Sequence, residues 1–142
     1  MKKFLTKKEF KNIYTKVPRA CIELVIFKGK KVLLTKRSIY PYKKYWHFPG
    51  GGILFREKIN DTIQRVAKTE LGVKVIPEKL LGYLETTRDG YRHGVSFAFK
   101  CRIPGKKQPQ ALEGSTEVKF FDKIPPKTVP FHKRFLKMIR KE

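Results

Sequence analysis

The sequence predicts a mixed α/β sandwich formed as one domain. Strand-like apolar segments and amphipathic helical segments are interspersed along the chain, which is the pattern of α/β folds. The 142 residues match the usual size of one globular domain, and nothing in them suggests a second. Apolar residues make up 40% of the chain and aromatic residues 13%, which is enough for a buried core despite the charge. We therefore expect a single domain over residues 1–142.

The first half of the chain predicts a short helix followed by extended segments. Residues 5–14 have the pattern of an amphipathic helix, with Thr6 as its N-cap and Glu9 three places on. Extended segments are expected next, joined by a tight turn at 28–30 and a loop at 38–44: 19–27, 31–36 and 45–49. The first two of these form a hairpin in this interpretation, and the third leads into three consecutive glycines.

The second half begins with the longest predicted helix, over residues 59–71. Its apolar residues recur at helical spacing on one face, and Gly72 follows as a C′ glycine does. Extended segments are expected after it, at 73–76, 80–87, 93–103 and 117–121. The tail from Phe131 alternates basic and apolar residues, which predicts a terminal helix packed on the body.

The formal net charge of +22 indicates either a polyanionic partner or a lysine-rich surface. Lysines are scattered from Lys2 to Lys141 in runs no longer than two, so we favour the lysine-rich surface. A field that attracts phosphate-bearing substrates is the alternative, and dedicated nucleic-acid binding is a third interpretation that we do not favour.

Cysteine usage and hydropathy predict a soluble cytoplasmic protein. Cys21 and Cys101 lie inside strand-like runs, which favours reduced thiols over a disulfide. The N-terminal residues lack the apolar region of a signal peptide. No window approaches the 18 or so apolar residues of a membrane span, so no membrane association is expected.

The segment 49–73 is the strongest candidate for chemistry. Three glycines at 50–52 let the backbone approach a ligand or take positive φ. Glu70 lies near the C-terminus of the predicted helix, where the dipole disfavours an anion, and it projects toward the apolar face. An inward carboxylate at that end needs a nearby cation: an arginine, a lysine or a metal ion. The alternative is that Glu70 reaches solvent from the last turn.

This segment resembles the Nudix box, G-x5-E-x7-R-E-U-x-E-E-x-G-U, where U is a bulky apolar residue. The matching positions are Gly51, Glu57, Arg65, Glu70, Gly72 and Val73. The flanking segments are also similar to Nudix hydrolases: a strand that ends at Arg37, the W-x-x-P-G-G pattern at 46–51 and a late strand at 117–121. The resemblance covers nearly the whole chain. It implies a Nudix-type α/β/α sandwich around a mixed β-sheet, and Mg²⁺-dependent hydrolysis of a diphosphate linked to another group.

Two departures from the box imply a reduced metal site. Val66 and Thr69 stand where Nudix hydrolases usually have glutamates that bind Mg²⁺ or activate water. The resemblance then implies one ion more readily than several, held by Glu70, the main-chain carbonyl of Gly50, the diphosphate and water, with Mn²⁺ as a substitute. Glu57 and Arg65, which with Gly72 form the structural part of the box, are interpreted as an ion pair that braces loop and helix. The alternative is an ordinary surface pair.

The same losses occur in one branch of the family, the GDP-mannose mannosyl hydrolases. Residues 65–72 resemble the box of that branch, and the N-terminal segment resembles one used there in dimer contacts. The resemblance implies a nucleotide-sugar substrate, attack at the anomeric carbon and a homodimer. Two departures from the branch argue against assigning its whole activity to this chain. Gly52 stands where the branch has a phosphate-binding arginine, and Gly114 and Ser115 stand where it has a glutamine and a histidine base.

Because the usual base is missing, several residues are candidates for it. Glu117 opens a strand and Glu113 lies nearby in sequence, so either is expected to act as base or as second metal ligand; the alternative for Glu117 is a surface glutamate. His93 falls where the mannosyl branch has a histidine that opens a central strand, and is either catalytic or an ordinary strand histidine.

Candidate substrate contacts lie on both sides of the glycines. Arg37 suits a phosphate contact, or is a surface charge at a strand end. Tyr45 is expected to stack on a base or sugar, or to cap the core, and His47 either touches substrate or points out of a short strand. The backbone at Gly51 and Gly52 is free to approach the ligand.

The leading hypothesis is therefore Mg²⁺-dependent hydrolysis of a nucleoside diphosphate linked to another moiety, with a nucleotide sugar as the first expectation. The enzymatic alternative is a pyrophosphatase that cleaves a phosphoanhydride of a nucleotide with a single-metal site. A third hypothesis is a catalytically silent Nudix domain that binds nucleotide or RNA, which suits the charge and the missing glutamates.

Overall fold

A mixed β-sheet carries the fold in the computed structural model, which describes residues 4–90 and 92–140. The expected single domain over 1–142 includes both chain ends, which lie outside these residues. The strands are β1 (Arg19–Lys28), β2 (Lys31–Arg37), β3 (Trp46–His47), β4 (Gly50–Gly52), β5 (Ile76–Asp89), β6 (Arg92–Arg102) and β7 (Ser115–Phe121). Their order is β3-β2-β1-β6-β5, with β4 paired to β1 and β7 paired to β2. β1 and β6 run parallel and the other pairs are antiparallel, so the sheet is mixed.

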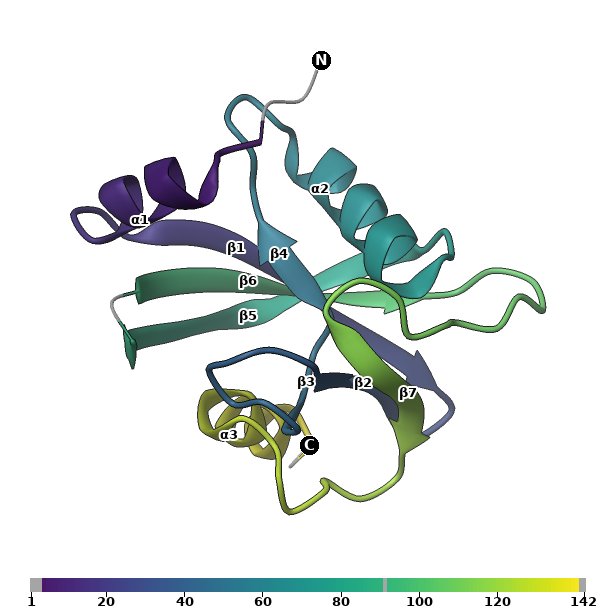
Figure 1. The fold of residues 1–142 in the computed structure, drawn as a ribbon. Coiled ribbons are helices and arrows are strands. Elements are labelled where there is room, and N and C mark those ends of the chain that lie inside the picture. The colour runs from purple at the N-terminus through teal and green to yellow at the C-terminus, as the bar shows by residue number, and fades with distance from the viewer. Residues whose placement is uncertain (1–3, 91, 141–142) are drawn as a thin grey trace.

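Helices cover both faces of this sheet. They are α1 (Lys7–Tyr14), α2 (Ile59–Val66), the π-helical turn η1 (Ala67–Leu71) and α3 (Pro130–Ile139). Figure 1 shows α2 above the sheet and α3 below it. The predicted capping box of α1 is confirmed, because Thr6 accepts from the Glu9 amide while the Glu9 carboxylate accepts from the Thr6 amide.

The core consists of two clusters because neighbouring residues of β1 point to opposite faces of the sheet. Ile22 and Leu24 pack with Ile63 of α2 in the first cluster. Val25 packs with Phe135 of α3 in the second cluster. The predicted α/β sandwich is therefore confirmed, with helical layers on both sides of the sheet.

Two elements differ from the sequence prediction. The helix predicted over 59–71 is α-helical only to Val66 and then widens into η1, which ends at Gly72 in the left-handed conformation with φ of 68°. The segments predicted at 73–76 and 80–87 are replaced by the one strand β5, because register shifts between Pro77 and Gly82 let a strand with turn-like residues stay paired to β6.

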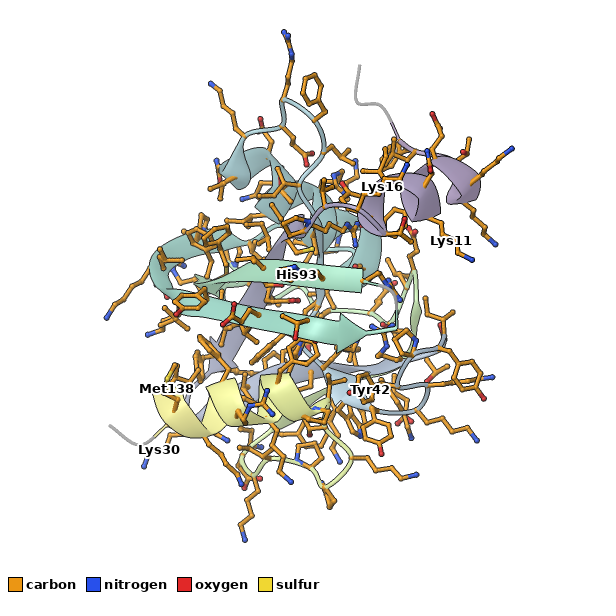
Figure 2. The ribbon with its side chains drawn as sticks, turned by 90° about the vertical axis from the view of Figure 1, so that its left-hand side faces the viewer. Lys11, Lys16, Lys30, Tyr42, His93 and Met138 are labelled. Atoms are coloured by element: carbon orange, nitrogen blue, oxygen red, sulfur yellow. The ribbon has the colours of Figure 1, made fainter. Side chains whose placement is uncertain are left out.

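The positive charge is distributed over distant parts of the surface. In Figure 2, Lys11 lies on α1 and Lys16 in the turn that follows it, whereas Lys30 lies at the turn between β1 and β2, toward the other end of the molecule. Such scattering agrees with the lysine-rich surface favoured from the sequence. No helix in the described part of the chain is long and apolar enough to cross a membrane.

Candidate active site

The close contact between β1 and β4 organises the candidate site. Gly50 pairs with Glu23 across the two strands. A Cβ atom at position 50 would collide with the Glu23 carboxylate and would lie 2.6 Å from the Ile22 carbonyl oxygen. Glycine is therefore required at position 50 by direct steric contact, and it lets a carboxylate from the neighbouring strand reach the site.

Glu70 reaches the same glycine from the π-helical turn. The Gly50 amide donates a hydrogen bond of 3.3 Å to Glu70 Oε1. Burial raises the pKa of Glu70 to about 8, and the negative charge of Glu113 raises it further, although the Gly50 amide and the charge of Arg37 act in the opposite direction. π-Helical turns are often found at functional sites, and this one turns Glu70 toward β4.

Glu23 is a second buried carboxyl at this point, and the sequence analysis did not propose it. Its exposed fraction is 8%. Burial raises its pKa to about 8; a hydrogen bond with Ser96 lowers it and the charge of Glu70 raises it. One signal was present in the sequence: Glu23 is the only acidic residue of the strand 19–27, and every other residue after Arg19 is apolar. A lone acid in a central strand is costly to bury unless it has a role.

Two buried histidines stand beside these carboxyls. His132 on α3 accepts a hydrogen bond from the Phe48 amide at Nδ1 (3.0 Å), and its Nε2 lies 3.8 Å from Glu23 Oε2. Burial lowers the pKa of His132 to about 3, and also lowers the pKa of His47 well below its ordinary value. Both imidazoles are therefore neutral near pH 7. His47 Nε2 is buried without a hydrogen-bond partner among the described residues.

Glu23, His47 and His132 line a cavity of about 150 Å³ between β1, β4 and β6. Of the predicted site residues, the cavity brings together Arg37, His47, Gly50, Gly51 and His93. Glu23, Arg19, Arg92 and His132 also line it, and the sequence had given none of them a catalytic or binding role. Arg37 is oriented by a 2.7 Å hydrogen bond from its Nε to the Pro41 carbonyl.

Arg19 occupies the space above Gly52. A Cβ at position 52 would collide with the Arg19 guanidinium, which stacks on the Phe10 ring with its Cζ 4.7 Å from the ring centroid. Gly52 stands where the GDP-mannose branch has a phosphate-binding arginine. The structure shows that a guanidinium is present at this point but comes from β1.

The ion pair between Glu57 and Arg65 braces the loop before α2. Arg65 Nε lies 2.9 Å from Glu57 Oε2, and the Glu57 side chain is only 1% exposed. Arg65 also donates to the Gly52 carbonyl at 2.7 Å, and Glu57 accepts from the Leu54 amide and the Thr62 hydroxyl. The pair is thus part of a buried hydrogen-bond network that connects β4, the loop and α2, rather than an ordinary surface pair.

Five of the predicted catalytic and substrate-binding residues do not line the cavity: Glu70, which reaches Gly50 from η1, Gly52, which lies beneath Arg19, and Glu117, Glu113 and Tyr45. Glu117 is exposed on β7 and pairs with Lys36 at 3.2 Å. Glu113 is exposed on the loop before β7, where its amide donates to the Thr69 carbonyl at 3.4 Å. Tyr45 packs on Tyr42, with ring centroids 5.5 Å apart.

The two positions without glutamate are occupied by residues with other functions. Val66 is buried in the core with 1% exposure and packs toward Gly51. Thr69 donates its hydroxyl to the Arg65 carbonyl at 2.9 Å. Neither side chain offers a carboxylate, so Glu70 is the acid that the box itself supplies.

The remaining donors suit a hard divalent cation. Among residues 4–90 and 92–140, no three His, Cys, Asp or Glu side chains are grouped so that they could hold a metal ion. What the site has is two carboxyls, the buried Glu23 and the half-buried Glu70, on the two sides of Gly50. Carboxylate and carbonyl oxygens are typical Mg²⁺ ligands, and Mg²⁺ completes its octahedron with water and substrate phosphate. The residues present therefore fit one ion.

The chain belongs to the Nudix family, because the NUDIX domain model matches residues 17–139. The ADP-ribose pyrophosphatase of Methanocaldococcus jannaschii is 30% identical over 123 residues, which cover 85% of this chain and 72% of that protein. The low-salt glycan biosynthesis protein Agl8 of Haloferax volcanii is 39% identical over 77 residues, 54% of this chain and 49% of that protein. The chain is therefore a hydrolase of the Nudix family, whose members generally use divalent metal ions and bind nucleotides.

Solved structures show the same fold. A MutT Nudix hydrolase from Burkholderia pseudomallei superposes with a TM-score of 0.76 at 22% identity, covering 87% of this chain and 99% of that chain. A bifunctional NMN adenylyltransferase/ADP-ribose pyrophosphatase from Francisella tularensis, solved with AMP and a manganese ion, has a TM-score of 0.69 at 15% identity. The match covers 94% of this chain and 45% of that one.

The buried carboxyls and histidines predict an unusual pH dependence of stability without metal. Glu23 and Glu70 titrate near pH 8 in the folded chain and near 4.5 when unfolded, so their contribution to stability is full below about 4.5 and is lost as pH rises through about 8. His47 and His132, with lowered pKa, contribute stability above about 6.5 that is lost as pH falls. Only the carboxyls act between 6.5 and 8. In EDTA, we expect the free energy of unfolding to fall over that window by about 1 kcal/mol or more.

Urea unfolding in EDTA at several pH values measures this dependence. The double variant Glu23→Gln/Glu70→Gln has no carboxyl to titrate at the site, so its stability should be nearly flat from pH 6.5 to 8. Adding Mg²⁺ to the wild type should reverse the loss, because a bound cation stabilises the ionised carboxylates. An identical decline in the double variant would show that other groups cause it.

Proposed function

We propose that this protein is a Mg²⁺-dependent hydrolase of a nucleoside diphosphate linked to a sugar. The observation that carries the proposal is the pair of carboxyls on either side of Gly50. Glu23 lines the cavity together with Arg19, Arg37 and Gly50, and Glu70 accepts the Gly50 amide from η1. This arrangement suits one metal ion and a diphosphate. The relative from M. jannaschii is an ADP-ribose pyrophosphatase, and ADP-ribose is itself a nucleoside diphosphate joined to a sugar.

The metal is assigned to Glu70 and the main-chain carbonyl of Gly50, with Mn²⁺ as a substitute for Mg²⁺. A bound Mg²⁺ would neutralise charge on the diphosphate and so stabilise it as a leaving group. Burial holds the pKa of Glu70 near 8, so ionising this carboxyl at neutral pH is unfavourable until a cation is present. Binding of the metal and loss of the Glu70 proton are therefore coupled.

The cations Arg19 and Arg37 are assigned to the phosphates. Both line the cavity, Arg19 from the start of β1 and Arg37 from the end of β2. A guanidinium presents donors in a fixed planar arrangement that matches phosphate oxygens. Gly51 lines the cavity, and Gly52 leaves space for the Arg19 guanidinium.

The proton acceptor that we propose is Glu23. It lies in the cavity, and its raised pKa, about 8, is close to the pH at which a general base must work. Water would attack the substrate, its proton would pass to Glu23, and the neutral His132 imidazole beside the carboxyl would hold it in place. His93 also lines the cavity and is the alternative, whereas Glu113 and Glu117 lie outside it.

The bond that breaks defines two candidate reactions. Attack at the anomeric carbon breaks the carbon–oxygen bond and releases free sugar and nucleoside diphosphate, as in the GDP-mannose branch that the sequence resembles. Attack at phosphorus breaks the phosphoanhydride and releases nucleoside monophosphate and sugar phosphate, and the ADP-ribose pyrophosphatase relative favours this second candidate. The reduced carboxylate set favours the first, since attack at carbon does not need several metal ions around the phosphorus.

Product analysis with GDP-mannose and ADP-ribose tests the proposal. Wild-type protein with Mg²⁺ should hydrolyse at least one of them, and EDTA should abolish turnover. Glu70→Gln should lower kcat by at least about 100-fold, because the amide removes the charge that holds the metal. Glu117→Gln is the matched control and should stay within about threefold of wild type, since this carboxylate is exposed on β7 and pairs with Lys36. Near-normal turnover in Glu70→Gln would refute the metal assignment. Binding of nucleotide without any turnover would favour the silent binding module.

The Arg19 assignment predicts a specific effect of a small substitution. Gly52→Ala introduces a methyl group into the space of the Arg19 guanidinium and should displace it, raising KM by about tenfold while kcat changes less. Gly29→Ala on the hairpin turn controls for a general loss of stability, because φ there is +62°, which strains any side chain, while nothing lies within 4 Å of a Cβ at that position. Unchanged KM in Gly52→Ala, with Arg19→Ala equally unaffected, would exclude Arg19 from substrate binding.

We also propose that the chain forms a homodimer through an apolar groove beside α1. The groove has a volume of about 410 Å³ and is lined by Phe4, Leu5, Phe10, Ile13, Tyr14, Arg19, Ile53, Leu54 and Phe55. Phe4 is 65% exposed and Phe55 is 87% exposed, which is unusual for phenylalanine in an isolated chain. Sedimentation velocity should give a dimer for the wild type and a monomer for Phe55→Asp. A monomeric wild type would refute this proposal and leave the catalytic one unaffected.

A further inference from the structure

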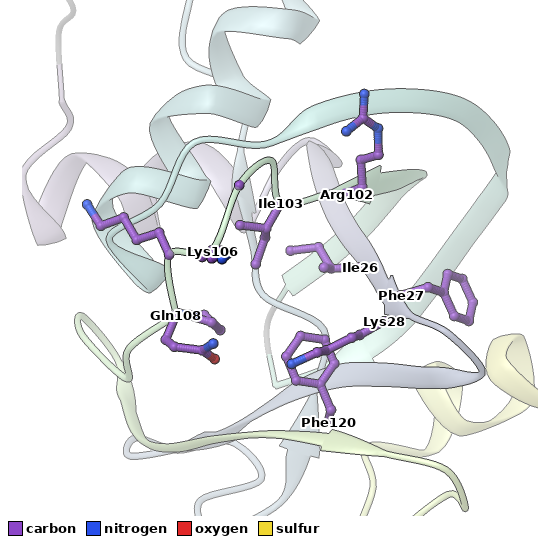
Figure 3. Close-up of a pocket in the computed structure, with 11 residues that line it drawn as sticks. Ile26, Phe27, Lys28, Arg102, Ile103, Lys106, Gln108 and Phe120 are labelled. Atoms are coloured by element: carbon purple, nitrogen blue, oxygen red, sulfur yellow. The ribbon is translucent and has the colours of Figure 1, made fainter.

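A second cavity lies at the opposite end of β1 from the catalytic residues. Its volume is about 430 Å³, and it is enclosed by the end of β1, the end of β6 and the loop that follows β6 (Figure 3). Lys28 lies five residues beyond Glu23 on β1, which at the rise of an extended strand is about 16 Å. The cavity is therefore separate from the site around Gly50.

The floor of this cavity is apolar. Ile26, Ile103 and Phe120 face the same space in Figure 3, whereas Phe27 points away from it. This difference follows from the alternation of side chains along β1, since Ile26 belongs to one core cluster and Phe27 packs against the other. The half-buried ring of Phe120 leaves apolar surface available to a flat ligand.

The rim of the same cavity is cationic. Lys28, Arg102, Lys106 and Lys107 are the charged residues among those that line it, and no acidic residue is among them. Arg102 has an acidic neighbour, since its Nε lies 3.4 Å from Glu78 Oε2. Lys28 Nζ lies 5.6 Å from the centre of the Phe120 ring, so a cation stands directly beside the apolar floor.

We propose that this cavity binds one phosphorylated nucleoside unit, with its base on Ile26, Ile103 and Phe120 and its phosphate among the three lysines. An uncharged apolar ligand would leave the lysines without counter-charge, and inorganic phosphate would leave the floor exposed. A nucleotide satisfies both parts, and the volume lies in the range of ligand pockets, roughly 300 to 1,000 Å³. Such a unit is available either as a free mononucleotide or as the 5′-phosphorylated end of a nucleic-acid strand.

Titration by NMR, in EDTA, locates binding at individual amides. AMP should shift the amides of residues 102, 103 and 105–108 in a saturable way, and inorganic phosphate should bind at least about tenfold more weakly because it makes no contact with the floor. Absence of shifts in that segment, or equal binding of AMP and inorganic phosphate, would overturn the proposal. Because catalysis is not measured, failure here leaves the hydrolase proposal intact, and loss of hydrolysis leaves this one intact.

Charge variants separate this site from general attraction to a protein with a net charge of +22. Lys106→Glu/Lys107→Glu should weaken AMP binding by at least about tenfold. The matched control, Lys7→Glu/Lys8→Glu, makes the same change to two adjacent exposed lysines on α1 and should stay within about twofold. Equal weakening in both variants would overturn the proposal.

Two further ligands and one floor variant complete the test. Phe120→Leu should weaken AMP binding but leave phosphate binding unchanged, since it removes the ring and keeps an apolar side chain; an unchanged affinity for AMP would contradict the role of the floor. A 5′-phosphorylated pentanucleotide that binds more tightly than AMP would support the end of a strand as the occupant. Tighter binding of AMP would support the free nucleotide.

Discussion

The close approach of β4 to β1 at Gly50 is the constraint on which the rest of the site depends. Because position 50 has no side chain, the Glu23 carboxyl reaches across from β1, and the Gly50 amide remains free to bind Glu70. Any larger residue would push the strands apart or displace Glu23. The same contact places the cavity at the junction of β1, β4 and β6, so the glycines determine the chemistry through the space that they leave.

Two losses along the sequence are compensated in space by residues of one strand. The box has Val66 and Thr69 in place of two glutamates; Val66 lies in the core and the Thr69 hydroxyl bonds to its own helix. Glu23 nevertheless brings another carboxyl to the site. Position 52 lacks an arginine, yet Arg19 fills the space above it. Both compensating residues belong to β1, whose antiparallel pairing with β4 brings 21–23 opposite the glycines, with Arg19 two positions before them. A reduced motif therefore does not mean a site without acids or guanidinium groups.

The fold was largely predictable from the sequence, and the candidate site only in part. Capping residues, alternation along strands and the glycine after η1 act locally, so the helices and the hairpin could be predicted close to their ends. The π-helical turn could not, because it depends on the loop 110–113, whose amides bond to the last carbonyls of the helix. Glu23 and His132 meet only through tertiary packing, 109 positions apart, which no local pattern indicates. The register of β7 on β2, which places Glu117 on the surface, could not be predicted from the sequence either.

The charge of the chain is not what balances the buried acids. Lysines and arginines give the protein a net charge of +22, but most are exposed and screened by water and salt. Arg37 lowers the pKa of both Glu23 and Glu70, and burial still holds both near 8. The nearby monovalent cations are therefore insufficient to ionise the pair at neutral pH. A divalent ion at Gly50 would bring twice the charge at contact distance, so the metal proposed there rests on the two carboxyls and their environment rather than on the composition of the chain.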